Sequence, residues 1–223
     1  MDTLTDHILT SREDLAARFD PPTERLKTKA LDYVNAAGRN FIERSPFLVL
    51  ATCGAEGLDC SPKGDAPGFV TVSEDGKTLL IPDRVGNNRI DGLKNLVEDA
   101  RVATIFFIPG ANETYRVNGR ARISADPELR ARFVVKGKEP KVVLVITVDQ
   151  AFQHCPKALL RSNLWQAAQA GRPEGAPTLG DFAVARGAES DKQALDAWYY
   201  GRVMDDLYSR GLPPSADHPT LGP

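Results

Sequence analysis

The sequence predicts a mainly β protein, an antiparallel barrel or sandwich with helices at both ends of the chain. Short runs rich in β-branched and aromatic residues follow one another between residues 47 and 148, separated by turn residues. Tight turns between such short strands favour antiparallel pairing, because parallel pairs need long crossovers. Most of the runs lack an intervening helical pattern, which disfavours a doubly wound parallel sheet. No internal repeat occurs, so we expect one domain over residues 1–223.

The first helical region is expected over residues 10–45. Thr10, followed three residues later by Glu13, resembles a capping box, and Pro21 with Pro22 ends any helix that it starts. Residues 23–44 place apolar side chains at steps of three and four, which predicts one amphipathic helix that Pro46 ends.

The strands are expected in the runs FLVLATC (residues 47–53), GFVTV (68–72), KTLLIPD (77–83), VATIFFI (102–108), ETYRVNGRARI (113–123) and VVLVITV (142–148). GAEG and SEDG are hairpin turns, and a loop through Pro67 precedes the second run. A short helix is predicted from Arg89 to Glu98, and Asp126 with Pro127 opens another.

A second helical region is expected over residues 156–210. The segment CPKALLRSNLWQAAQ looks helical, residues 171–180 form a linker rich in Gly and Pro, and Ser190 with Gln193 caps a last helix. The tail from residue 212 is expected to be disordered or draped on the surface.

Composition excludes several classes of protein. With 42% hydrophobic and 26% charged residues and a net charge of −2, the chain belongs to the ordinary soluble globular class. A pI of about 6.0 lacks the basic excess of non-specific nucleic-acid binding, so no nucleic-acid partner is expected. The apolar runs are far shorter than the roughly 18 residues of a membrane span, and the amino terminus lacks a secretory pattern. We expect a cytoplasmic protein whose three cysteines are reduced.

Residues 61–69 (SPKGDAPGF) break the strand pattern with two prolines, two glycines and opposite charges. Glycine lets a ligand approach the backbone closely, and Lys63 offers positive charge to an anion. A surface turn with a solvated ion pair is the alternative interpretation. The spacing of a P-loop is absent, so nothing indicates nucleotide hydrolysis.

Residues 84–89 (RVGNNR) stand where a strand passes into a helix. Free amides at a helix start, a positive dipole end, an Asn able to cap and the guanidinium of Arg89 together suit a phosphate. A capped helix with solvated arginines fits the same residues.

The run over residues 113–123 has a basic face, because a period of two places five polar or basic side chains on one side: Thr114, Arg116, Asn118, Arg120 and Arg122. Charged strand faces are usually only solvated, yet Thr114 and Arg116 are placed to reach a ligand or a partner subunit. His154 beside Cys155 suggests metal or thiol chemistry, but no third ligand stands at a recognisable spacing, and free cysteine is most often a buried apolar residue. We therefore expect no metal site and a buried Cys155.

In order, the motifs SPFLVLAT, SPKGDAPGFV, LLIPDRVGNNRIDGLKNL, VATIFFIPG, ETYRVNGRARI and HCPKALLRSNLW resemble those of the pyridoxamine 5'-phosphate oxidase-like superfamily of flavin-binding proteins, in a branch expected to use FMN. The resemblance covers roughly residues 25–166. It implies an antiparallel split β-barrel of the FMN-binding type with flanking helices, formed as a homodimer with an FMN in each of two interface clefts.

The resemblance also implies cofactor-binding residues. A backbone edge along the isoalloxazine falls on Asp65, Ala66, Pro67, Gly68, Phe69 and Val70, with Lys63 just before it, and the phosphate turn falls on Asn87, Asn88 and Arg89. Thr114 approaches the ring from the partner subunit, with Arg116 near it, while Lys157 and Arg161 in the late segment reach the cofactor. Thr114 stands where the vitamin-forming oxidases commonly have glutamine, and Asn88 with Arg89 where they have an Arg-Lys pair, so vitamin B6 oxidation is not expected.

The resulting hypothesis is an FMN-dependent oxidoreductase acting on an unidentified small molecule. The flavin carries the hydride chemistry, so no catalytic side chain is required, and Lys63 or Arg116 is placed to stabilise the reduced flavin. The alternatives are a reductase that uses the deazaflavin F420 in the same cleft and a non-catalytic flavin-binding or haem-binding protein.

Overall fold

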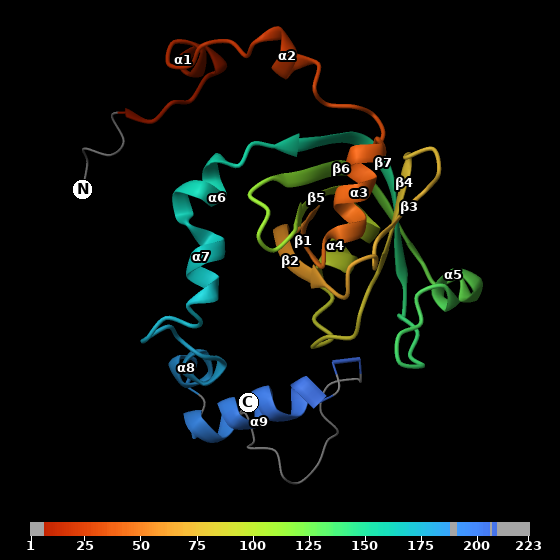
Figure 1. The fold of residues 1–223 in the computed structure, drawn as a ribbon, viewed down its shortest axis with the longest axis vertical. Helices are drawn as coiled ribbons and strands as arrows, with labels where there is room; N and C mark the ends of the chain where they lie inside the picture. The colour runs from red at the N-terminus through yellow and green to blue at the C-terminus, as the bar shows by residue number, and fades with distance from the viewer. Residues whose placement is uncertain (1–6, 188–190, 206, 209–223) are drawn as a thin grey trace.

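The computed structural model describes residues 7–187, 191–205 and 207–208, and its centre is one seven-stranded antiparallel sheet (Figure 1). The strands are β1 Phe47–Gly54, β2 Gly57–Gly64, β3 Thr71–Val72, β4 Thr78–Pro82, β5 Arg101–Phe107, β6 Thr114–Ser124 and β7 Val143–His154. Their order in the sheet is β2-β1-β5-β6-β7-β4-β3. The predicted fold class, mainly β with flanking helices, is confirmed, and the curled sheet is consistent with a split barrel.

The core lies on the concave side of the sheet. Along β1 and β5 every second side chain is buried, as the period of a half-buried strand requires. Leu48, Phe106 and Ile81 have no exposed surface, and Leu96 of α4 (Asp91–Glu98) joins the same cluster. The helix α4 begins two residues later than predicted.

The prediction of one helix over residues 23–44 is wrong. The structure has two short helices there, α2 Glu24–Lys27 and α3 Ala36–Arg44. Between them Leu31 pairs with Ala151 of β7 through two backbone hydrogen bonds of 3.0 and 2.7 Å, which only extended backbone can form. The side chain of Asn35 then caps α3 by accepting from the amide of Gly38.

The amino-terminal helix α1 spans Arg12–Ala16. Its capping box uses Ser11 and Asp14, one residue beyond the predicted Thr10 and Glu13.

The strand β2 is an element that the sequence did not reveal, because Pro62 interrupts its pattern. It pairs with β1 over its full length and lies at the edge of the sheet, where a proline is tolerated since one side makes no ladder hydrogen bonds. Residues 65–70, expected as a strand edge, instead form a turn in which Gly68 has a φ of +89°. Only Thr71–Val72 of the run GFVTV is a strand.

Helices beyond the barrel complete the described chain. The predicted cap at Asp126 is confirmed at α5, Pro127–Ala131. The late helical segment divides at Asn163, whose φ is +51°, into α6 Lys157–Ser162 and α7 Leu164–Gln169. The expected linker contains the start of α8, Leu179–Ala185, and α9 spans Lys192–Asp205. The predicted cap Ser190 and the tail from residue 212 lie outside the described residues.

The helices α1 and α2 and the late helices α6 to α9 lie away from the barrel, whereas α3 packs against it (Figure 1). Four of them, α1, α2, α6 and α7, contain no buried residue. Within the described ranges, no helix has the length and apolar character to cross a membrane.

Candidate functional site

A network of ion pairs joins the end of β2 to the segment that follows β4. Lys63 pairs with Asp83 at 2.7 Å, and Asp65 pairs with Arg84 at 2.5 Å. The Asp65 side chain is only 2% exposed, and it also accepts a hydrogen bond of 2.5 Å from the hydroxyl of Tyr208. Lys63 and Asp65, both predicted to bind the cofactor, thus have their charges neutralised within the chain, and their role at a cofactor stays a prediction.

Hydrogen bonding sets the protonation state of this network. Burial raises the pKa of Asp65, but the hydrogen bonds from Tyr208, the Ala66 amide and Arg84 outweigh burial and hold the pKa below its ordinary value of 3.8. The bond to Asp65 in turn raises the pKa of Tyr208. Asp65 is thus a carboxylate at neutral pH, linked to a residue near the carboxyl end of the chain.

The predicted phosphate turn lies exposed at the entrance to α4. Asn87, Asn88 and Arg89 are all exposed, and Asn88 has a φ of +60°. Asn87 does not cap the helix as expected; its side chain accepts from the amide of Arg89 at 2.9 Å. Within the described chain, the amides of residues 86–88 donate to no group. The Arg89 guanidinium, with its side chain 80% exposed, pairs with Asp91.

The predicted flavin-edge residues 65–70 divide into two groups. Ala66, Pro67 and Gly68 are exposed and present backbone to solvent. Phe69 and Val70 are 6% and 1% exposed and belong to the core cluster. Only the first group is exposed to a ligand.

The outer face of the sheet, opposite the core, carries Thr114 and Arg116, which were predicted to approach the flavin ring. Thr114 is buried, while Arg116 stacks on Phe152 of β7, with its Cζ atom 4.7 Å from the ring centroid. The buried Arg116 Nε and Asn118 Oδ1 have no hydrogen-bond partner among the described residues. Buried polar atoms without a partner are rare in proteins, so these two atoms mark an unusual position on this face.

The sheet register separates Thr114 and Arg116 on β6 from the predicted residues at and after the end of β2, which are Lys63 and residues 65–70. Thr114 pairs with Phe107, Phe107 with Phe47, and Phe47 with Gly64. Three strand spacings therefore lie between Thr114 and the end of β2, roughly 14 Å along the sheet. No hydrogen bond or ion pair joins the two sets within the described chain.

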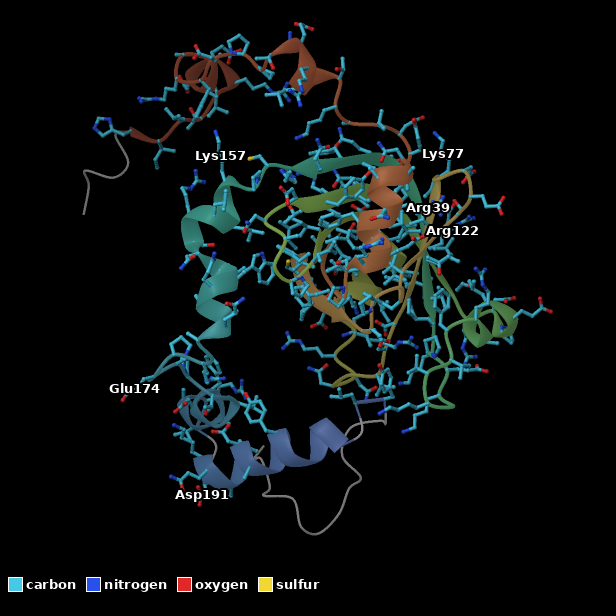
Figure 2. The ribbon with its side chains drawn as sticks, in the orientation of Figure 1. Arg39, Lys77, Arg122, Lys157, Glu174 and Asp191 are labelled. Carbon is cyan, nitrogen blue, oxygen red and sulfur yellow. The ribbon has the colours of Figure 1, made fainter. Side chains whose placement is uncertain are left out.

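The late segment contributes exposed side chains. Lys157 and Arg161 lie on α6, and Lys157 stands at its start, apart from the barrel (Figure 2). Trp165 ties α7 to the β5–β6 loop through a hydrogen bond of 2.6 Å to the carbonyl of Ala111. The expectation of a buried Cys155 is wrong: the thiol is free and exposed, because β7 has ended one residue before it. Among described side chains, no three His, Cys, Asp or Glu residues group as metal ligands.

One charged cluster was not predicted as a unit from the sequence. Lys29, Arg116 and His154 converge on the ring of Phe152, with Lys29 Nζ 5.0 Å from its centroid and the His154 ring at 5.1 Å. Burial, followed by the charges of Arg116 and Lys29, lowers the pKa of His154. The sequence indicated Arg116 and His154 separately, but not Lys29 or Phe152, because the members of the cluster come from different segments of the chain.

Comparison with known proteins identifies the family. The family model of pyridoxamine 5'-phosphate oxidase matches residues 34–155, which is more than half of the chain. The chain therefore belongs to that family. The comparison with curated proteins finds no match.

Solved structures with a similar fold include HupZ of Group A Streptococcus, which is 21% identical, with 52% of this chain and 89% of that chain covered and a TM-score of 0.41. General Stress Protein 26 of Bacillus anthracis is 16% identical, with 51% and 88% covered and a TM-score of 0.40. A NimC/NimA family protein of Clostridium acetobutylicum is 16% identical, with 52% and 83% covered and a TM-score of 0.36.

Proposed function

We propose that the protein is an FMN-dependent oxidoreductase that acts on a small molecule as a homodimer, with the flavin at the subunit interface. The observation that carries the proposal is the exposed turn at residues 86–89. It offers three consecutive free amides and an exposed guanidinium in a chain of the pyridoxamine 5'-phosphate oxidase family. Successive amides in a turn with a positive φ form a concave donor surface that suits a phosphate.

The donor chemistry of this turn fits the FMN phosphate. Arg89 already pairs with Asp91, but that pair is largely solvated, and exposed ion pairs contribute little. If the Arg89 guanidinium leaves Asp91 and binds a phosphate dianion instead, the loss of the ion pair therefore costs little free energy. The new contact adds charge-assisted hydrogen bonds. The bound flavin would supply the redox chemistry, while the turn holds its phosphate.

The two cations predicted near the flavin ring are not equivalent. Lys63 is neutralised by Asp83 at 2.7 Å, whereas Arg116 has no carboxylate partner among the described residues. Arg116 is thus the one whose positive charge remains available to a reduced, anionic ring. Arg116 lies on β6, three strand spacings or roughly 14 Å along the sheet from the β2 set, and a site shared between two subunits is one way in which both sets reach one cofactor.

The outer sheet face supports a homodimer. On β1 and β5 the side chains that alternate with the core are mainly apolar rather than polar: Phe47, Val49, Ala51, Ala103, Ile105 and Phe107. A sheet face that remained in water would carry polar residues there, so this face is suited to cover by another chain. The outlying helices add exposed apolar side chains, including Leu15 at 48%, Leu160 at 56% and Leu164 at 42% exposure.

Titration of the apoprotein with FMN tests the cofactor. We expect saturation near one FMN per chain, and Arg89→Ala should weaken FMN binding roughly ten- to a hundredfold because a charge-assisted phosphate contact is lost. Riboflavin, which lacks the phosphate, should lose far less. Arg101→Ala is the matched control, since Arg101 is also exposed and paired with a nearby aspartate, Asp99. Saturation by F420 or haem in place of FMN would contradict the proposal and favour those cofactors.

Sedimentation tests the dimer. The wild-type protein should sediment as a dimer, and Phe47→Asp, which places a charge on the outer face, should shift it toward monomer and weaken flavin binding. The control is Leu58→Asp on β2, where an 86% exposed side chain lies outside the β1–β5 apolar set. A compact monomer that holds flavin tightly would refute the interface site.

A further inference from the structure

We propose that the cleft between the amino-terminal segment and the end of β7 binds the oxyanion of a small molecule, a carboxylate or a phosphate, at a site separate from the turn of residues 86–89. The cleft has a volume of about 700 Å³, which lies within the range of small-molecule sites. Its lining comes from residues 23–29 on one side and from the ends of β6 and β7 on the other: Thr23, Arg25, Leu26, Lys29, Glu113, Gln153, His154, Cys155 and Pro156.

The charge of the cleft is predominantly positive. Arg25 and Lys29 line it against one carboxylate, Glu113, and Arg116 adds a further cation beside the ring of Phe152. The imidazole of His154, whose pKa is lowered, lines the cleft as well. None of the cations at this cleft forms an ion pair with a described carboxylate, and Glu113 forms none either. Elsewhere cations are commonly paired, as at Lys63, Arg84, Arg89 and Arg101. Like charges gathered without counter-charge repel one another, and an anion relieves that repulsion.

The geometry at Phe152 brings these groups together. Lys29 Nζ and Arg116 Cζ lie 5.0 and 4.7 Å from the centroid of the ring, and the His154 ring lies 5.1 Å from it. The buried Nε of Arg116 has no hydrogen-bond partner in the described chain. This is a donor without an acceptor beside a cleft that has room for one.

The fold fixes these positions. Phe152 is the register partner of Arg116, and His154 is the partner of Thr114, so the strand ladder sets their spacing. Lys29 is held two residues before Leu31, whose backbone pairs with Ala151 of β7. The break in the expected helix over residues 23–44 therefore places a cation on the cleft, which a continuous helix would not.

The identification of the anion as the acidic group of the substrate rests on the proposed function, whereas the anion site itself does not. A flavin-dependent enzyme needs its substrate held in a fixed orientation, and a cationic cleft beside Arg116 is suited to grip an acidic group. The substrate class would then be small carboxylic acids or phosphate esters.

The test is a titration with inorganic phosphate and with succinate at constant ionic strength, followed by the NMR signals of the histidine rings. The chain has only three histidines, so His154 can be assigned with His154→Gln. Both anions should move the His154 signals in a saturable manner and raise its pKa, because a nearby anion stabilises the imidazolium. The titration is run on the protein as purified and again after FMN addition, so a failure to bind FMN leaves the test of this site intact.

Matched variants separate a site from general electrostatics. Lys29→Gln should weaken phosphate binding about tenfold, since it removes a cation that lines the cleft. Lys27→Gln removes the same charge from the same segment, but Lys27 pairs with Glu24 and does not line the cleft, so binding should change less than about twofold. Equal losses in the two variants, or no response of His154, would overturn the proposal. Loss of phosphate binding on FMN addition would also overturn it, because the cleft would then be the cofactor's own phosphate site.

Discussion

Asp65→Ala is expected to destabilise the protein by about 3 kcal/mol. Removing one partner of a buried ion pair typically costs about 3–5 kcal/mol, because the other charge stays buried without compensation. The Asp65 side chain is 2% exposed and the Arg84 side chain 16%, so the carboxylate of this pair is buried and the guanidinium is partly buried. We expect the lower end of the range because Arg84 keeps a hydrogen bond of 2.6 Å to the carbonyl of Phe133.

Urea unfolding, analysed by linear extrapolation, measures this loss. Asp99→Ala is the control, since it also breaks an aspartate–arginine pair, but the Arg101 side chain is 68% exposed and the loss should be much smaller. The double variant Asp65→Ala/Arg84→Met should recover part of the stability, because no charge is left buried. Equal losses for Asp65→Ala and Asp99→Ala, or a double variant no better than the single one, would refute the reasoning.

The same pair gives a dependence on pH with a defined sign. The folded-state pKa of Asp65 lies below the ordinary 3.8. Its stabilising contribution is therefore fully present above pH 3.8 and is lost as the pH falls through the lowered folded-state value. The difference in unfolding free energy between wild type and Asp65→Ala should shrink below about pH 4. An unchanged difference would show that the carboxylate charge does not carry the effect.

The remaining predictions concern the fold, a thiol and the carboxyl-terminal contact. Gly119→Ala should cost about 2 kcal/mol or more in urea unfolding, because a Cβ there would lie 2.0 Å from the Thr147 carbonyl oxygen at the β-bulge of β6. Cys155→Ala should change stability by less than about 0.5 kcal/mol and leave flavin reduction unchanged, since the thiol is exposed; lost turnover in the folded, flavin-loaded variant would show thiol chemistry. Tyr208→Phe should raise the pKa of Asp65, as measured by carboxyl NMR, because one hydrogen bond to the carboxylate is lost.

The strands with a clear period were predictable from sequence, and the elements set by distant partners were not. The runs that became β1, β5 and β6 carry their alternation locally, and the structure confirms them. The helical pattern over residues 23–44 is equally regular, yet Leu31 pairs with Ala151, which is distant in sequence. This backbone pairing keeps the chain extended at Leu31, and a pattern read over neighbouring residues cannot predict it.

The candidate site shows the same division. Arg89 was identifiable because its whole turn is contiguous in sequence, and the structure leaves that turn exposed. The cluster around Phe152 was not identifiable, since Lys29, Arg116 and His154 come from three segments that only the ladder and the Leu31 bridge bring together. A short motif can predict an exposed turn, whose phosphate binding stays a prediction here, but it cannot predict a charge cluster assembled by tertiary pairing.

The pairing of cations with carboxylates separates residues that hold the fold from residues that remain available to ligands. Lys63 was predicted to bind the cofactor, and Arg84 begins the segment that leads to the predicted phosphate turn. Both hold carboxylates in part-buried pairs, so their substitution should first lower stability. Arg89 pairs only with a partner that solvent screens, and Lys29 and Arg116 have no carboxylate in the described chain. Substitution of these three should change binding more than folding. On this division rest our two proposals, flavin phosphate recognition at the Arg89 turn and oxyanion recognition at the Phe152 cluster.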